Sequence, residues 1–332
     1  MRKEHRKINI KDLSRKLGVS VATASRALSG KGRVSAETRE KIRRKADELG
    51  YRANIHARNL ILRRSENIAF FYTNIEKGKP DYFMSEVMLG ANDATAKRNM
   101  HLLVNPISNS DDQPMEFYTD FLLNGTIAGA IVVTANKASD NLLEIAAGGN
   151  IPSIAIGDTK MDGVHKVTFQ LEKGGMLAGD YFRKSGRGNP AYVGGFMDGL
   201  KKKGFRKGLG QLGAKLFQDL GGASFEDGKD SFGRIIAAAP KTDCVLCAND
   251  VLAMGFIKGA ALAGFNVPGD IAVIGFDDIQ AAAYHSPALT TIRLHNYQIG
   301  ETAANVLLDL IEGRSTRTET VIGPVLIGRE SA

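Results

Sequence analysis

Cysteine is nearly absent from the chain of 332 residues, which holds only Cys244 and Cys247 in the apolar run CVLC. Two ligands cannot complete a zinc site, and a redox CxxC motif usually opens a helix, so this run is interpreted as a buried strand. No apolar run reaches the ~18 residues of a membrane span. The first residues, MRKEHRKINIKDLSRK, are charged and contain no apolar signal core. A cytoplasmic protein with no membrane partner is therefore expected.

The motifs of common enzyme classes are also missing. The sequence has no GxGxxG that opens a helix, no GxxxxGK[ST] and no GxSxG, the patterns of dinucleotide sites, phosphate-binding loops and serine hydrolases. Its six histidines are scattered, and none has a carboxylate or cysteine at the spacing of a metal site or a triad. We therefore expect that the protein is not an enzyme and that it binds no cofactor and no metal.

What the sequence does contain is an uneven distribution of charge. Residues 1–64 hold 19 Lys and Arg against 6 Asp and Glu, whereas the other 268 residues hold 25 against 30. The first part thus carries +13 and the rest −5, within a net charge of +8. A basic segment joined to a mildly acidic body is typical of a polyanion-binding module fused to a second function.

Two short helices are predicted in this basic segment, over KDLSRKL (11–17) and VATASRAL (21–28). Gly18 can adopt the left-handed conformation that ends the first helix, and Ser20 is a good N-cap for the second. A third helix is predicted within 34–51, capped by Ser35 and ended by Gly50. Two short helices joined by a tight turn that contains glycine form a helix-turn-helix.

The composition of the second helix suits a helix that lies in the major groove of DNA. Ala24, Ala27 and Leu28 are expected to pack inward. The opposite side chains are expected to face base edges, Arg26 a guanine and the apolar ones thymine methyl groups: Val21, Ala22, Ser25 and Arg26. Hydroxyl groups are expected to hold phosphates, which position the protein without specifying sequence: Ser20, Thr23, Ser25, Ser35 and Thr38.

Residues 10–60 resemble the DNA-binding head of the lactose/galactose repressor (LacI/GalR) family. The shared motifs are GVSxxTxSRxL, followed by VSxxTRxxIxxxAxELGYxxNxxAxxL. The resemblance implies a hinge helix in the following linker that folds on DNA and, paired in a dimer, wedges a leucine into the minor groove. Ala53 departs from the proline that family members often carry there. The resemblance adds these residues to the DNA-binding set: Ser29, Arg33, Asn54, Ala57 and Leu60.

From residue 66 the pattern changes to strands that alternate with helices, which predicts an α/β fold with parallel sheets. The predicted strands are NIAFFYT, HLLVNPI, GAIVVT, IPSIAIGD, PAYVGG, CVLCAND and IAVIGFDD. The predicted helices cover 81–98, 114–124, 139–148, 171–184, 226–238, 250–263 and 297–311.

The segment 66–331 resembles the effector domain of the same family, a relative of periplasmic sugar-binding proteins, with landmarks such as ANDVLAMGFIKGA and GFNVPGDIAVIGFDDI. The resemblance implies two Rossmann-like subdomains joined by three crossings, near 163–166, 291–295 and 322–326. The expected domains are a helix-turn-helix head over 1–53, a hinge over 54–65, a first subdomain over 66–163 plus 293–324, and a second over 164–292 plus 325–332.

Effector-binding residues are expected where strands end, because ligands of such folds bind in the crevice outside the carboxyl ends of the strands. The motifs carry over to three polar residues, Asp158, Asn249 and Asp277, which suit a hydroxyl-rich ligand. Phe169 matches a pocket position where many members have Asp. Tyr82 and Phe83, in the loop after the first strand, are expected to stack on a sugar or base ring.

Lys201 stands where the family has an arginine that grips the effector, and the preceding loop is a few residues short. Lysine cannot make the planar fork of arginine. With the neighbouring basic residues it could favour an anionic ligand such as a sugar phosphate. The alternative is that most of this cluster is a solvated helix face.

The sequence thus predicts a homodimeric, sequence-specific DNA-binding regulator that binds a pseudo-palindromic operator, most simply as a repressor. A small sugar-like effector between the subdomains is expected to control it. Control by a sugar phosphate, a nucleobase or a phosphoprotein corepressor is the alternative.

Overall fold

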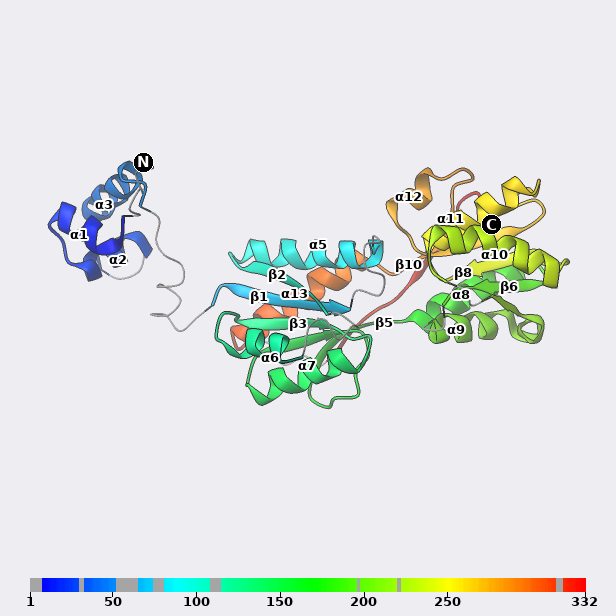
Figure 1. Ribbon diagram of the computed structural model, residues 1–332, viewed down its shortest axis with the longest axis horizontal. Coiled ribbons are helices and arrows are strands. Elements are labelled where there is room, and N and C mark those ends of the chain that lie inside the picture. Colours follow the sequence, from blue (N-terminus) through cyan, green and yellow to red (C-terminus); the bar gives the residue numbers. More distant parts are fainter. Residues whose placement is uncertain are drawn as a thin grey trace, which may run out of the picture. The chain divides into compact units, whose positions relative to one another are not determined.

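The computed structural model describes residues 8–29, 33–51, 65–73, 81–107, 115–195, 198–219, 222–314 and 319–332. The chain divides into two compact units, Met1–Ser65 and Glu66–Ala332 (Figure 1). In the described ranges no helix is long and apolar enough to cross a membrane.

The first unit is built from three helices, α1 (Ile10–Leu17), α2 (Val21–Ser29) and α3 (Ala36–Glu48). Gly18 ends α1 with a φ of 68°, as the sequence predicts. Ser20 Oγ accepts a hydrogen bond of 3.0 Å from Thr23 N, and Ser35 Oγ accepts one of 3.2 Å from Thr38 N. These bonds satisfy N–H groups that the first turn of a helix leaves unpaired. The core of this unit consists of Leu13, Ala24, Ala27, Ile42 and Ala46.

The second unit contains two sheets of six strands, and each sheet forms one half of the unit. The first sheet is entirely parallel, in the order β11-β5-β4-β3-β1-β2. Its strands are β1 (Asn67–Thr73), β2 (His101–Ile107), β3 (Gly129–Val133), β4 (Ser153–Ile156), β5 (His165–Phe169) and β11 (Glu319–Ile322).

The second sheet has the order β12-β10-β9-β8-β6-β7, and its edge strand β12 is antiparallel to β10. Its strands are β6 (Pro190–Val193), β7 (Phe217–Asp219), β8 (Cys244–Cys247), β9 (Ala272–Asp277), β10 (Thr290–Arg293) and β12 (Val325–Ile327). Cys244 and Cys247 are buried and free. The α/β fold expected from the sequence is confirmed, because all seven predicted strands and all seven predicted helices of this unit form.

Helices cover both sheets (Figure 1). The first half carries α5 (Tyr82–Lys97), α6 (Met115–Leu123), α7 (Lys137–Gly148) and α13 (Asn296–Ile311). The second half carries α8 (Leu171–Lys184), α9 (Gly199–Leu209), η1 (Gly210–Lys215), α10 (Phe225–Ala238), α11 (Asp250–Leu262) and α12 (Gln280–Tyr284). Helices α5 and α13 pack without intervening side chains at Gly90, where a Cβ would lie 2.0 Å from Tyr297 O.

The first crossing lies later than expected. The predicted subdomain boundary at 163/164 puts residues 165–169 in the second subdomain, but β5 pairs with β4 and β11 of the first sheet. The chain therefore changes sheets after Phe169, because β5 lies between β4 and β11 in the first sheet. The other two changes follow β10 and separate β11 from β12.

Tyr82 and Phe83 lie in the helix predicted over 81–98 and not in the loop after the first strand. Tyr82 and Phe83 form the first turn of α5, which begins directly after Asp81. The Asp81 side chain accepts a hydrogen bond of 2.9 Å from Met84 N and thus caps the helix.

Candidate functional site: a helix-turn-helix face and an acidic pocket

Helix α2 has one buried and one exposed face. Ala24 and Ala27 are fully buried, and Leu28 is half-buried, so the predicted inward side is confirmed. The four residues expected to meet base edges lie at exposed positions, and Val21 is 42% exposed: Val21, Ala22, Ser25 and Arg26. Small side chains on this face let the helix backbone approach a groove closely.

The hydroxyl groups expected near phosphates lie at the helix starts. Ser20 Oγ lies 2.8 Å from Thr23 Oγ1, and Ser35 Oγ donates a bond of 2.8 Å to Thr38 Oγ1. Arg33 is exposed. Three predicted contact residues lie outside the described residues: Asn54, Ala57 and Leu60. The side chain of a fourth, Ser29, also lies outside the described part of the structure.

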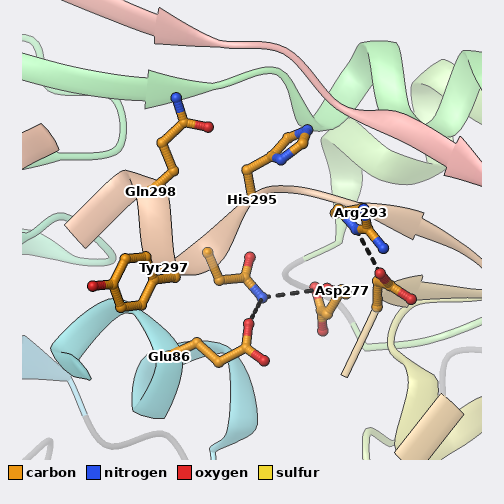
Figure 2. A pocket seen from close by; sticks show the side chains of 8 residues that line it. Glu86, Asp277, Arg293, His295, Tyr297 and Gln298 are labelled. Atoms are coloured by element: carbon orange, nitrogen blue, oxygen red, sulfur yellow. Dashed lines mark hydrogen bonds and ion pairs between the residues drawn. The ribbon is translucent and has the colours of Figure 1, made fainter. Parts of the chain in front are cut away.

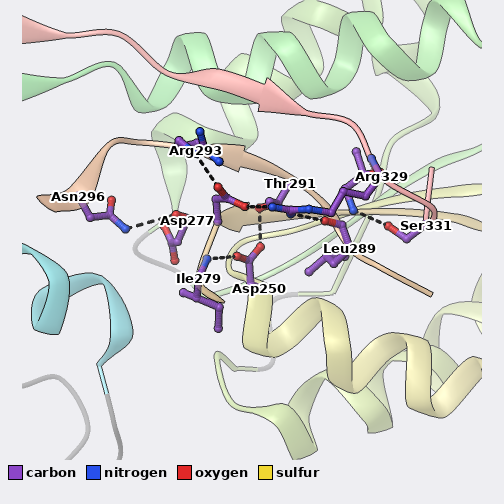
Figure 3. Close-up of polar contacts among 11 residues, drawn as sticks. Asp250, Asp277, Ile279, Leu289, Thr291, Arg293, Asn296, Arg329 and Ser331 are labelled. Carbon is purple, nitrogen blue, oxygen red and sulfur yellow. Dashed lines mark hydrogen bonds and ion pairs between the residues drawn. The ribbon is translucent and has the colours of Figure 1, made fainter. Parts of the chain in front are cut away.

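The second candidate site lies where β9 ends. Asp277 and Asp278 follow one another with φ values of 107° and 56°, a left-handed conformation that non-glycine residues adopt rarely. Asp278 is held by two arginines, one from β10 and one near the chain end. Its Oδ2 accepts from Arg293 Nε and its Oδ1 from Arg329, each at 2.6 Å. This ion-pair network fixes the turn that presents Asp277 (Figure 3).

Asp250 completes the support beneath this turn, and sequence reasoning missed it. It is 1% exposed, accepts a bond of 2.8 Å from Ile279 N and accepts the hydroxyl hydrogen of Thr291. Burial raises the pKa of the Asp250 carboxyl, and the charge of Asp277 adds to this rise. The first-turn position after a capping Asn could have indicated a structural carboxylate here.

Asp277 itself lies in an acidic environment. The pKa of its carboxyl is raised to about 7, chiefly by burial; Lys201 opposes this rise, and the charges of Asp81, Asp198 and Glu86 contribute to it. Unlike the outer lysines of its helix, Lys201 points inward. It is 13% exposed, donates a bond of 2.7 Å to Ala248 O and lies 4.4 Å from the centre of the Phe276 ring.

Asn296 connects the two halves at this point. Its Nδ2 donates to Glu86 Oε2 of α5 at 3.1 Å and to Asp277 O at 3.3 Å. These residues line a pocket of about 350 Å³ (Figure 2). The remaining lining residues are Asp278, Arg293, His295, Tyr297 and Gln298. Sequence reasoning did not single out Glu86 or Asn296, because neither belongs to a strand-end motif.

The other predicted effector residues are placed differently. Phe83 and Phe169 contact each other, with ring centres 5.5 Å apart, and Tyr82 is 46% exposed. Asn249 caps α11, because its Oδ1 accepts from Leu252 N at 2.7 Å while its Nδ2 donates to Ala223 O. Asp158 is 86% exposed and pairs with Lys166 at 3.2 Å. Asp277 and Lys201 thus interact, whereas Asp158 lies apart in an ion pair of its own.

Metal chemistry has no evident location in the part of the chain that the structure describes, where no three His, Cys, Asp or Glu side chains are grouped to hold an ion.

Comparison with known proteins finds matches to both units of the chain. Residues 9–54 match the family described as bacterial regulatory proteins, lacI family, and residues 180–332 match the periplasmic binding protein-like domain. The repressor PurR of Erwinia tasmaniensis is 30% identical over 97% of this chain and 96% of its own. The probable repressor ExuR of Bacillus subtilis is 27% identical over 95% of each chain.

Solved structures show the same fold. The lac repressor dimer bound to operator and the anti-inducer ONPF superimposes with a TM-score of 0.85, at 22% identity over 98% of this chain and 99% of the other. The complex of the regulator CelR with cellobiose gives 0.70, at 24% identity over 98% and 100%. These relatives are named as regulators or repressors. The chain belongs to the lacI family of bacterial regulatory proteins and is a DNA-binding transcription regulator.

Proposed function

We propose that the protein represses transcription as a homodimer on a pseudo-palindromic operator, with one α2 in the major groove of each half-site. The observation that carries this proposal is the exposed face of α2, where small side chains surround a single arginine, Arg26. The relatives named as repressors and the operator-bound dimer of the lac repressor support the same interpretation. Two identical heads read two half-sites of opposite direction.

A small effector in the pocket between the two halves controls operator affinity in this proposal. The pocket brings together Glu86 of α5 and Asp277 of β9, so a ligand bound there changes how the halves are held. Such control requires only that the ligand prefer one arrangement of the halves over another. A sugar-like ligand is supported by the cellobiose complex of CelR. No enzymatic activity is proposed.

The proposal is tested by selecting an operator from a random DNA pool with the full-length protein. We expect Arg26→Ala to lower affinity for the selected duplex by about 1–3 kcal/mol, the value of a bidentate base contact, and to leave weak binding to a scrambled duplex. Arg44→Ala is the matched control, because Arg44 is an exposed arginine on α3. Equal loss on both duplexes would show that Arg26 contacts phosphate and not a base.

A further inference from the structure

The pocket between the halves contains a buried acceptor that has no donor. Asn296 is 2% exposed, and its Nδ2 faces two acceptors, Glu86 Oε2 and Asp277 O. Because both neighbours are acceptors, the amide atom that faces them is the nitrogen, and the amide atom on the opposite side is the oxygen Oδ1. Among the described residues this Oδ1 has no hydrogen-bond partner. An unpaired buried polar atom costs about 1–3 kcal/mol. A ligand that donates a hydrogen bond to Asn296 Oδ1 removes this cost.

The carboxylates around Asn296 have the same requirement. Among the described residues, Glu86 accepts only from Asn296 Nδ2, and no donor reaches the carboxyl group of Asp277. The nearby cations have other partners. Arg293 donates to Asp278, and Lys201 donates to Ala248 O. The lining contains three carboxyl groups, of Glu86, Asp277 and Asp278, against the one guanidinium of Arg293, and therefore carries an excess of negative charge.

Resting on the proposed effector role of this pocket, we propose that the effector bears hydroxyl or protonated amine groups and no negative charge. These groups donate hydrogen bonds to Asn296 Oδ1 and to the carboxyl groups of Glu86 and Asp277. The phosphate or carboxylate group of an anionic ligand offers no donor to these acceptors, and the net negative charge of the lining repels it. A sugar phosphate, which the sequence suggests through the basic residues near Lys201, is therefore not the expected effector.

The arrangement of those basic residues agrees with this choice. Lys203 and Lys207 both pair with Glu172, and each is more than half exposed. They lie on the outer surface of α9, whereas Lys201 points toward Phe276. Lys203 and Lys207 thus lie on a solvated helix face with a carboxylate partner of their own, and Lys201 is the inward lysine.

The test is a thermal-shift and calorimetric screen of the full chain with sets of ligands that share a skeleton and differ in charge. One set holds glucose, glucosamine, glucose 6-phosphate and glucuronate, and parallel sets are built on galactose, mannose and ribose. We expect the rise in Tm to be confined to the neutral and amine members. A ligand at 100 times its Kd gives a readable shift, because binding then lowers the population of unfolded chains about 100-fold.

Variants distinguish the two donor types. Glu86→Gln removes the charge and keeps the shape, so we expect it to weaken an amine ligand about tenfold or more and a neutral ligand only a few-fold. Glu144→Gln, at an exposed position on α7, is the matched control and should change neither. A Tm without ligand equal to that of the wild type shows that each variant is folded.

The outcomes separate this inference from the function on which it rests. A phosphate or uronate that binds as tightly as its neutral counterpart overturns the inference and leaves an effector-controlled regulator. If no member of any set shifts Tm while the protein still binds its operator, the proposed effector role fails together with the inference.

Discussion

At the scale of the residue, the titration of Asp277 makes the stability of the protein depend on pH. Its pKa is raised from the ordinary range of a carboxyl to about 7, first by burial and then by Asp81, Asp198 and Glu86. A carboxyl with a raised pKa in the folded state adds stability only below its unfolded pKa near 4, and this stability is lost as pH rises toward 7. The free energy of unfolding should therefore fall over this range.

Asp277→Asn should remove this pH dependence. We expect the variant to exceed the wild type in free energy of unfolding at pH 8 by about 1–3 kcal/mol, and to differ little at pH 4. Urea denaturation at the two pH values measures the difference. Asp158→Asn is a suitable control, since Asp158 is exposed. A wild type that gains stability between pH 5 and pH 8 relative to Asp277→Asn would contradict a raised pKa.

Asp278 differs from Asp277 in having cationic partners, because its carboxylate forms ion pairs with Arg293 and Arg329. Its side chain is 6% exposed, so Asp278→Ala leaves Arg329 with a charge that is 17% exposed and without its partner. We expect a loss of about 2–4 kcal/mol in the free energy of unfolding, typical of breaking a buried pair. Urea denaturation of the variant and the wild type measures this loss. A loss below about 1 kcal/mol would show that water replaces the carboxylate.

The sequence predicted Asp277 because it ends a strand motif, and it predicted Asn249 for the same reason. The two residues differ in the local structure that comes after each of them. Asn249 begins a long helix, so its side chain is used as a cap, whereas Asp277 precedes a left-handed turn that leaves its carboxyl in the pocket. Glu86 and Asn296 lie 210 positions apart. Only the three-dimensional pairing of α5 with α13 brings them together, and no local pattern indicates it.

At the scale of the element, continuous apolar strands were predictable from the sequence, and short strands at the edges of the sheets were not. Strands such as β1 and β8 are continuous apolar runs buried on both faces, which is typical of parallel sheets. Strand β7 is only three residues, FQD, all half-buried, and β11 is largely exposed at a sheet edge. Such strands form because a neighbouring strand offers them hydrogen bonds. Their own few residues therefore give no pattern from which they can be predicted.

The contact between α5 and α13 gives a test at this scale. A Cβ on Gly90 would lie 2.0 Å from a backbone oxygen of α13, so Gly90→Ala should force the helices apart and cost about 1–3 kcal/mol of unfolding free energy. Gly233→Ala is the matched control inside α10, because nothing lies within 4 Å of its added Cβ. The control should stabilise by about 0.5–1 kcal/mol. Thermal denaturation measures both.

At the scale of the whole molecule, the chain separates its two functions by charge. The first 64 residues carry +13 and the remainder −5, so the helix-turn-helix unit attracts DNA while the body does not. This division, unlike the pocket, was predictable from the sequence, because net charge needs no knowledge of which residues meet. Binding to phosphates releases condensed counterions, and the logarithm of affinity then falls linearly with the logarithm of salt concentration.

Operator affinity should thus fall steeply between 50 mM and 200 mM salt, by about 10³-fold if each dimer neutralises six or more phosphates. Affinity for an uncharged effector should change less than about twofold over the same range, because its contacts are short hydrogen bonds and not screened charges. Fluorescence anisotropy with a labelled operator and calorimetry with the ligand measure the two slopes. If the operator slope were as shallow as that of the ligand, the basic charge of the head would not be the source of DNA affinity, and binding would depend on base contacts and hinge insertion alone.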